Sequence, residues 1–363
     1  MTGGFCDTKI NNLKKRLTRR LQLYYLFHSY YLFNNTLASD SYFFYWDDSY
    51  EVVLPELPWT YETGDTVMAI NIPKNGEFII AGGWNNDVYM FDKDSSVPLW
   101  NFSDIYGVLS ISSDANSDYI AVGAADGLYL LNRSGEELWR YDTGSSNYVN
   151  TVSISEDGKY IVANSGDTIN LFHKGSNTPL WSFEAQGGVN SLDISANGDY
   201  IAAGDSRGYA YCFDRNSSTP LWTYILDEPI NSVDISADGN YIVFGSSDKY
   251  VYLFTPEDDN PIWRYKTESN VNSVVISSNS EYISAGTLSS RIYFFGVEDN
   301  NPLWSRDLGS ASNGIRSLSM SSDGEHIIVS ISAGHLYLFH KDSDEPIWNY
   351  DTNNDRLHSL DIS

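Results

Sequence analysis

From about residue 57 to the C-terminus, apolar residues alternate with small or polar residues at a period of two. Typical runs are INSVDIS (230–236), YIVFGSSD (241–248) and VYLF (251–254). Such alternation gives a pleated strand one apolar face. Turn pairs that supply the positive φ angles of tight hairpins lie between the runs, at Asp157-Gly158, Asn197-Gly198, Asp238-Gly239 and Asp323-Gly324. No helical period appears after Trp59, so the pattern predicts an all-β domain and excludes a parallel α/β fold.

The strands belong to a repeat that is marked by tryptophan. The residues that recur are Trp59, Trp100, Trp139, Trp181, Trp222, Trp263, Trp304 and Trp348, at spacings of 41, 39, 42, 41, 41, 41 and 44. This period is that of a four-stranded β-propeller blade, whose strands we call a, b, c and d, with the Trp on d. A Trp at one fixed position of every blade indicates packing between blades rather than a ligand platform.

The number of blades follows from two strands that are left over. Seven complete units run from Val67 to Trp348, with one extra d strand before them (58–61) and one extra a strand after them (357–363). The segment YLFNNTLASDSYFF (31–44) aligns with YIVFGSSDKYVYLF (241–254) and supplies the missing b and c strands. We therefore predict an eight-bladed propeller as a single domain over 30–363, with residues 30–34, 41–46, 57–61 and 357–363 in the last blade. The alternative is a seven-bladed ring.

Two families resemble the repeat. The segment SADGNYIVFGSSDKYVYLF (236–254) resembles the core of a WD-repeat blade, and it places Asp248 in the b–c turn. The equivalent residues in other blades are Asp87, Asp126 and Asp167. Where WD repeats have Trp at the end of strand c, this chain has Phe; its Trp lies in PLW or PIW on strand d, similar to pyrroloquinoline-quinone-type propellers. The resemblance implies the propeller fold but specifies no ligand.

Residues 1–29 differ from the repeat in composition. Six basic residues precede the apolar and aromatic run LQLYYLFHSYYLF (21–33), and Thr36-Leu37-Ala38 follows it. This order is that of a secretory signal or signal anchor. Polar residues interrupt the run, so an ordinary folded or membrane-touching segment is the alternative. At 13 residues, the run is shorter than the roughly 20 needed to span a bilayer.

Charge and cysteine content exclude several functional classes. The 363 residues include 22 Lys and Arg against 48 Asp and Glu, a formal charge of −26 that opposes binding to nucleic acid or anionic lipid. The cysteines, Cys6 and Cys212, cannot supply the vicinal pair that a quinone-dependent dehydrogenase of the resembled type would need. The histidines form no metal-ligand spacing and no serine has a nucleophile-elbow context. We therefore predict a protein that is not an enzyme, with no cofactor and no metal.

Four residues are the binding candidates. Trp84 lies outside the tryptophan period, in the b–c turn of the first blade, and is better suited to binding than the repeated residues. Arg207, Lys249 and Arg291 are cations in the b–c turns of three successive blades and could form a basic arc for a carboxylate-bearing partner. Isolated solvated charges are the alternative. The acidic c–d loops, such as DKDSS (92–96) and PEDDN (256–260), indicate solvated turns rather than calcium sites.

Together, these features predict a monomeric, non-enzymatic scaffold that binds a protein or a surface glycan across one face. The alternative function is a quinoprotein-like dehydrogenase, or a propeller hydrolase or lyase with its active site at the channel. The signal-like N-terminus and the acidic, Asn/Ser/Tyr-rich composition predict an extracellular or cell-surface location, with the cytoplasm as the alternative. Membrane contact is expected only through the N-terminal segment.

Overall fold

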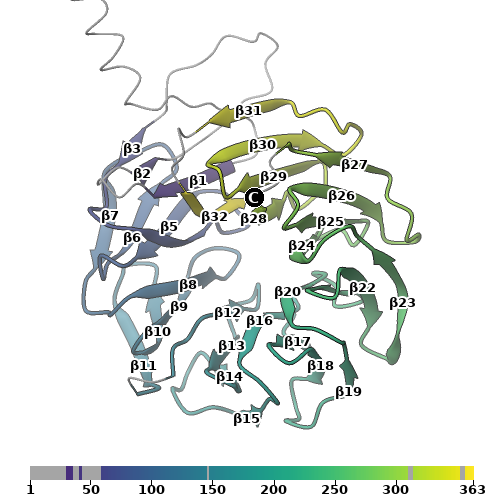
Figure 1. The fold of residues 1–363 in the computed structure, drawn as a ribbon. Coiled ribbons are helices and arrows are strands. Elements are labelled where there is room, and N and C mark those ends of the chain that lie inside the picture. Colours follow the sequence, from purple (N-terminus) through teal and green to yellow (C-terminus); the bar gives the residue numbers. More distant parts are fainter. Residues whose placement is uncertain (1–29, 36–40, 43–58, 145–146, 310–313, 352–355) are drawn as a thin grey trace, which may run out of the picture.

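A computed structural model of the protein describes residues 30–35, 41–42, 59–144, 147–309, 314–351 and 356–363. These residues form seven four-stranded antiparallel sheets, arranged as blades around a central axis (Figure 1). The all-β propeller predicted from the sequence is therefore confirmed. No helix in the described part of the chain is long and apolar enough to cross a membrane. The predicted signal or anchor over residues 1–29 lies outside the described residues.

In each blade, strands a to d follow one another from the axis to the outer edge (Figure 1). The blades are β4 (Val67–Asn71), β5 (Phe78–Gly83), β6 (Val88–Asp92) and β7 (Pro98–Phe102); β8 (Val108–Ser113), β9 (Tyr119–Ala124), β10 (Gly127–Asn132) and β11 (Glu137–Asp142); β12 (Val152–Ile154), β13 (Tyr160–Ser165), β14 (Thr168–His173) and β15 (Trp181–Glu184); β16 (Val189–Ile194), β17 (Tyr200–Asp205), β18 (Tyr209–Asp214) and β19 (Trp222–Ile225); β20 (Ile230–Ile235), β21 (Ile242–Ser246), β22 (Tyr250–Thr255) and β23 (Asp258–Lys266); β24 (Val271–Ile276), β25 (Tyr282–Thr287), β26 (Arg291–Gly296) and β27 (Trp304–Asp307); and β28 (Ile315–Met320), β29 (His326–Ile331), β30 (His335–His340) and β31 (Trp348–Asp351). We number them blades 1 to 7. The glycines of the predicted a–b hairpins have the expected positive φ, for example +72° at Gly198 and +75° at Gly239.

The residues assigned to an eighth blade form two smaller sheets. Strand β1 (Tyr30–Asn35) pairs with β32 (Arg356–Ile362), and β2 (Ser41–Tyr42) pairs with β3 (Thr60–Tyr61). These are the expected a–b and c–d pairings, but β2 has only two residues and no ladder joins it to β1 in the described residues. The prediction of eight four-stranded blades is therefore wrong, and the alternative count of seven is correct. Strand β32 lies between β28 and β4 and closes the innermost circle of strands (Figure 1).

The repeated tryptophans join each blade to the next. Trp263, in the d strand of blade 5, packs on Phe295 of blade 6 at a ring-centroid distance of 5.5 Å. Its indole N–H donates to the carbonyl of Val297 at 2.7 Å. The same donation, to the c–d loop of the following blade, occurs from Trp59 to Lys93, Trp100 to Arg133, Trp139 to Lys174, Trp181 to Arg215, Trp222 to Pro256 and Trp304 to Lys341. Near the end of strand c, six blades have a Phe whose ring meets the Trp of the preceding blade, and blade 2 has Leu131 there.

Candidate functional site

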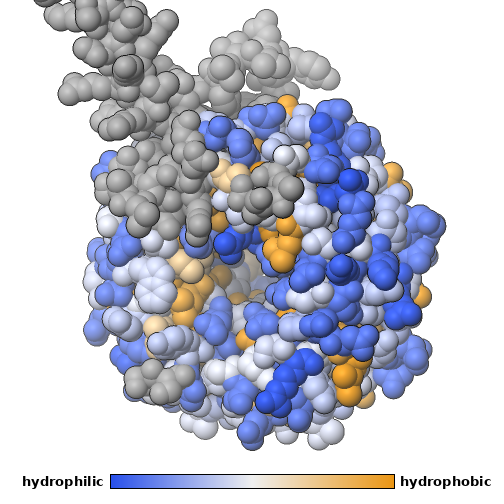
Figure 2. Space-filling model, viewed as in Figure 1, coloured by the Kyte–Doolittle hydropathy of each residue, from blue (hydrophilic) through white to orange (hydrophobic). Residues whose placement is uncertain are grey.

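The innermost strands surround a cavity of about 320 Å³ on the axis of the ring. Figure 2 looks along this axis and shows the hollow at the centre of the molecule. Polar side chains from the fifth position of successive a strands line the cavity: Ser112, Ser153, Asp193 and Asp234. A propeller channel is a common place for a ligand, so these side chains are the first candidates for chemistry.

The polar side chains of the channel bond to the neighbouring blade. The Asp193 carboxylate accepts from the backbone N–H of Ile235 at 3.1 Å, and Asp234 accepts in the same way from Ile276 at 2.7 Å. Serines at the third position of strand a accept from the next strand too, as from Val233 N–H to Ser191 at 3.0 Å. The NSxDIS pattern of strand a therefore supplies side chains that hydrogen-bond to the adjacent inner strand, and we call these hydrogen bonds ties. They connect a strands that share no backbone ladder.

The same ties connect the last strand to the first. Asp361 in β32 accepts from the N–H of Ile72, the residue after β4, at 2.8 Å and from the Ser319 hydroxyl of β28 at 3.0 Å. Ser359 accepts from the N–H of Ile70 at 3.3 Å. The C-terminal strand thus occupies the eighth place in the inner circle with the contacts of a regular a strand.

Burial raises the pKa of the channel carboxyls. It raises that of Asp361 to about 6, against a usual value of 3.8, although the N–H groups of Ile72 and Ile362 oppose the rise. Burial also raises the pKa of Asp193, and raises that of Asp234 well above its usual range, helped by the charge of Asp193. Asp193 and Asp234 line the cavity, and all three residues are partly exposed. Their oxygens are already bonded to serines and backbone N–H groups, which favours a structural role over a catalytic one.

Three exposed aromatic residues lie on the face formed by the b–c turns and d–a connections. Trp84, Tyr106 and Tyr148 are 42%, 61% and 48% exposed. Trp84 packs over Gly107, whose N–H donates to Asn86 at 2.9 Å. The N–H of Ala125 in blade 2 bonds the carbonyls of Tyr106 and Gly107, and the next connection presents Tyr148 beside the same blade. The sequence analysis selected Trp84 but missed both tyrosines, although each is an aromatic residue in a polar d–a connection.

We expect Gly107→Ala to lower stability by about 1–3 kcal/mol and to displace the Trp84 ring. Gly107 has φ of +62°, and a Cβ there would lie 2.7 Å from the Trp84 ring. Thermal unfolding and tryptophan fluorescence measure the two effects. Gly144→Ala is the control, since Gly144 has φ of +75° but nothing within 4 Å of an added Cβ, so it should lower stability without shifting the fluorescence. Unchanged fluorescence in Gly107→Ala would contradict this packing.

The predicted basic arc is less uniform than its sequence suggested. Arg207 and Lys249 are exposed in their b–c turns, and Lys249 has φ of +76°. Arg291 is instead the first residue of β26 and lies 3.4 Å from Glu268 and 3.5 Å from Asp307. Arg207 and Lys249 thus occupy different positions in equivalent turns, whereas Arg291 lies in the strand after the third turn and is paired with acidic side chains.

Two families match the chain in sequence. Residues 56–224 are similar to the family described as outer membrane protein assembly factor BamB, and residues 219–255 to the WD domain, G-beta repeat. The chain is a β-propeller whose repeats are similar to PQQ-like and WD repeats. The WD match in this propeller covers the d strand of blade 4 and strands a to c of blade 5. No curated protein matches the chain.

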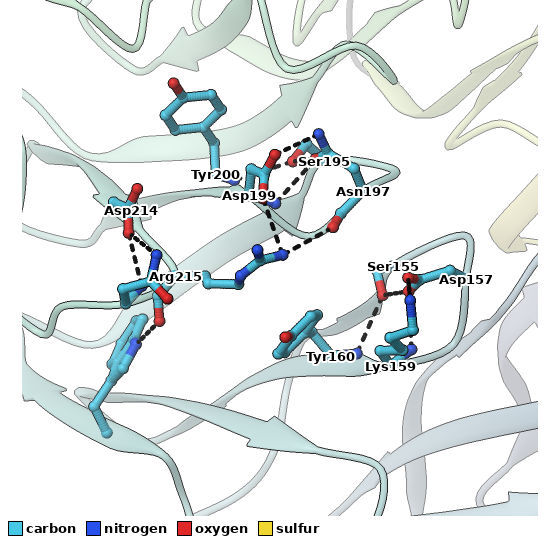
Figure 3. Close-up of polar contacts among 12 residues, drawn as sticks. Ser155, Asp157, Lys159, Tyr160, Ser195, Asn197, Asp199, Tyr200, Asp214 and Arg215 are labelled. Atoms are coloured by element: carbon cyan, nitrogen blue, oxygen red, sulfur yellow. Dashed lines mark hydrogen bonds and ion pairs between the residues drawn. The ribbon is translucent and has the colours of Figure 1, made fainter.

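The opposite face of the propeller carries the a–b turns and the c–d loops. In the a–b turns, one serine hydroxyl holds the turn together: Ser195 accepts from the N–H of Tyr200 at 3.0 Å and donates to Asn197 at 2.9 Å (Figure 3). At the acidic c–d loops, an aspartate carboxylate accepts from the backbone N–H of the residue two positions later. Asp92 accepts from Asp94, and Asp258 accepts from Asn260. Across the parts of the propeller that the structure describes, no group of three or more His, Cys, Asp or Glu side chains could hold a metal ion.

Proposed function

We propose that this propeller is a non-enzymatic scaffold that binds a protein partner on the face of the b–c turns and d–a connections. The observation that carries the proposal is the exposure of three aromatic side chains on this face, Trp84, Tyr106 and Tyr148. Tyr and Trp are the side chains most enriched at the energetic centres of protein interfaces, because they bury a large area at a small cost in conformational entropy. A surface glycan, which also stacks on aromatic rings, is the alternative occupant.

The channel supports the scaffold proposal over the quinoprotein or hydrolase alternative. Its carboxylates, Asp193 and Asp234, are engaged by backbone N–H groups of the next blade, as Asp361 is at the point of ring closure. A catalytic carboxylate would need a free oxygen directed at a substrate. A rigid ring held by such ties is suited to presenting a fixed surface.

The decisive experiment compares capture from native extract by the parent protein and by variants. A double variant, Trp84→Ala with Tyr106→Ala, should lose the specific partner, with at least a tenfold fall in affinity once that partner is purified. The control is Leu180→Ala, which removes an exposed apolar side chain from the outer edge of blade 3 and should leave capture unchanged. Equal loss in both variants, or none in the double variant, would reject this surface. Displacement of the partner by free oligosaccharide would favour the glycan.

A separate titration tests the enzyme alternative. Pyrroloquinoline quinone with Ca²⁺ should leave the melting temperature and the absorbance spectrum of the protein unchanged. A saturable shift in either would favour the quinoprotein reading.

A further inference from the structure

A cation lies over an aromatic ring at several junctions between blades. The ring belongs to the first residues of strand b in one blade, and the cation is the first c–d loop residue of the next. The pairs are Arg133 over Phe78 (5.4 Å from charge to ring centroid), Lys174 over Tyr119 (4.0 Å), Arg215 over Tyr160 (4.8 Å) and Lys341 over Tyr282 (5.6 Å). In each pair, the carbonyl of the cationic residue also accepts the N–H of the preceding blade's Trp, so the four positions are equivalent.

Arg215 shows the arrangement in detail. Its guanidinium lies over Tyr160 and 2.9 Å from the Asp199 carboxylate, and it also donates to the carbonyl of Asn197 at 3.2 Å (Figure 3). The ring face and the carboxylate together hold the cation. Asp118 and Glu325 accompany Arg133 and Lys341 in the same way, at 3.3 and 3.2 Å.

The junction between blades 4 and 5 has the ring but not the cation. Pro256 takes the equivalent position, since its carbonyl accepts from Trp222 N–H at 3.1 Å. Among the described residues, no Lys or Arg lies over Tyr200, the ring of this junction. Val297 also replaces a cation, at the next junction, but there the aliphatic side chain is buried and packs in one cluster with Tyr241. Of the two junctions that lack a cation, the one at Tyr241 is filled by Val297, and the one at Tyr200 is unfilled.

A groove of about 480 Å³ opens at the Tyr200 position. Its lining residues are Tyr200, Asp214, Leu221, Trp222, Pro256, Glu257, Asp258 and Asp259. Glu257, Asp258 and Asp259 are exposed, and no ion pair joins any of the four acidic lining residues to a cation of the described chain. Burial raises the pKa of Tyr200, and the charges of Glu257 and Asp214 raise it further, which indicates a negative potential at the ring. Leu221 adds an apolar wall that is 51% exposed.

We propose that this groove binds an arginine side chain of a basic segment of a partner protein, with the guanidinium over the Tyr200 ring. The chain itself supplies the template, because Arg215 occupies the same position at the adjacent junction. The acidic side chains take the place that Asp199 has beside Arg215, and Leu221 contacts the apolar part of the incoming side chain. The site lies on the face opposite Trp84. It does not depend on the function proposed for the face that carries Trp84.

The test uses a tetra-arginine peptide with blocked ends and isothermal titration at about 0.15 M salt, where diffuse attraction to the acidic surface is screened. Pro256→Arg places an internal guanidinium over Tyr200 and should raise the Kd of the peptide by about tenfold. Thr178→Arg, in the exposed c–d loop of blade 3, adds the same charge away from the groove and should change the Kd less than about twofold. Tyr200→Leu keeps an apolar side chain at the junction and should weaken binding about fivefold.

Two results would overturn the proposal. The first is equal weakening by Pro256→Arg and Thr178→Arg, which would mean that the peptide responds to net charge alone. The second is that Tyr200→Leu and Pro256→Arg bind the peptide as tightly as the parent does. Absence of any binding by the parent would also overturn it. Thermal melts verify that each variant is folded. Pro256→Arg should melt no lower than the parent, because the new side chain copies the contact of Arg215.

Discussion

Replacing Trp263 with alanine is expected to lower the free energy of unfolding by about 3–5 kcal/mol, measured by urea denaturation. The side chain is only 8% exposed, packs on Phe295 of the next blade and donates a hydrogen bond to Val297. The substitution therefore leaves a cavity at a junction between blades and an unpaired carbonyl beside it. Trp263→Phe keeps most of the packing and should lose about 1–2 kcal/mol, the share of the hydrogen bond and the smaller ring.

Trp84→Ala is the matched control for this prediction. It removes the same side chain from an exposed turn, so it should change the free energy of unfolding by no more than about 1 kcal/mol. A loss from Trp263→Ala as small as that from Trp84→Ala would contradict the role of the repeated tryptophans in joining blades.

The second large effect is a dependence of stability on pH at the point of ring closure. The pKa of Asp361 is about 6 in the folded protein against 3.8, so the folded state binds more protons between these values. The stability that this carboxyl contributes is therefore complete below about pH 3.8 and is lost as pH rises through 6. Asp361→Asn should consequently gain about 2–3 kcal/mol relative to the parent between pH 4 and pH 7.5.

Urea denaturation of both proteins across this range provides the measurement. A stability difference that stays constant with pH would contradict a raised pKa at Asp361. Asp258→Asn is a control of opposite sign, because hydrogen bonds from Asn260 lower the pKa of Asp258. That variant should lose stability relative to its parent as pH rises. The parent itself should be more stable at pH 5 than at pH 7.5, since burial raises the pKa of Asp193 and Asp234 too.

The fold could be predicted because the features that define the repeat depend on residues close together in the sequence. The spacing of tryptophans, the alternation of apolar residues and the Asp-Gly or Asn-Gly hairpins each depend on neighbouring residues, and each recurs in almost every blade. The blade count was harder. The alignment of residues 31–44 with 241–254 identified the pairing of β1 with β32, but it could not show that β2 would be too short to complete a four-stranded sheet.

The binding surfaces could be predicted only in part, because they depend on contacts between blades. Trp84 could be selected because it lies outside the tryptophan period. Tyr106 and Tyr148 become binding candidates only in the structure, where their connections lie beside blade 2. Asp193 and Asp234 looked like ordinary strand residues, and only the ring brings their carboxylates to the next strand. Pro256 carried no signal by itself, because its significance lies in the lysine or arginine that blades 2, 3, 4 and 7 have in its place.

The ties between a side chain and a backbone N–H around the channel run the same way, from the side chain of one inner strand to the backbone of the strand that follows it. Strand a of each module of about 41 residues therefore carries both the side chains that bond to the following module and the N–H groups that bond to the preceding one. Duplication or deletion of one module within the gene would leave every junction between blades complementary without any compensating mutation. The similarity of adjacent modules in this chain is what growth by copying would produce, and the interface that permits it is encoded inside each copy.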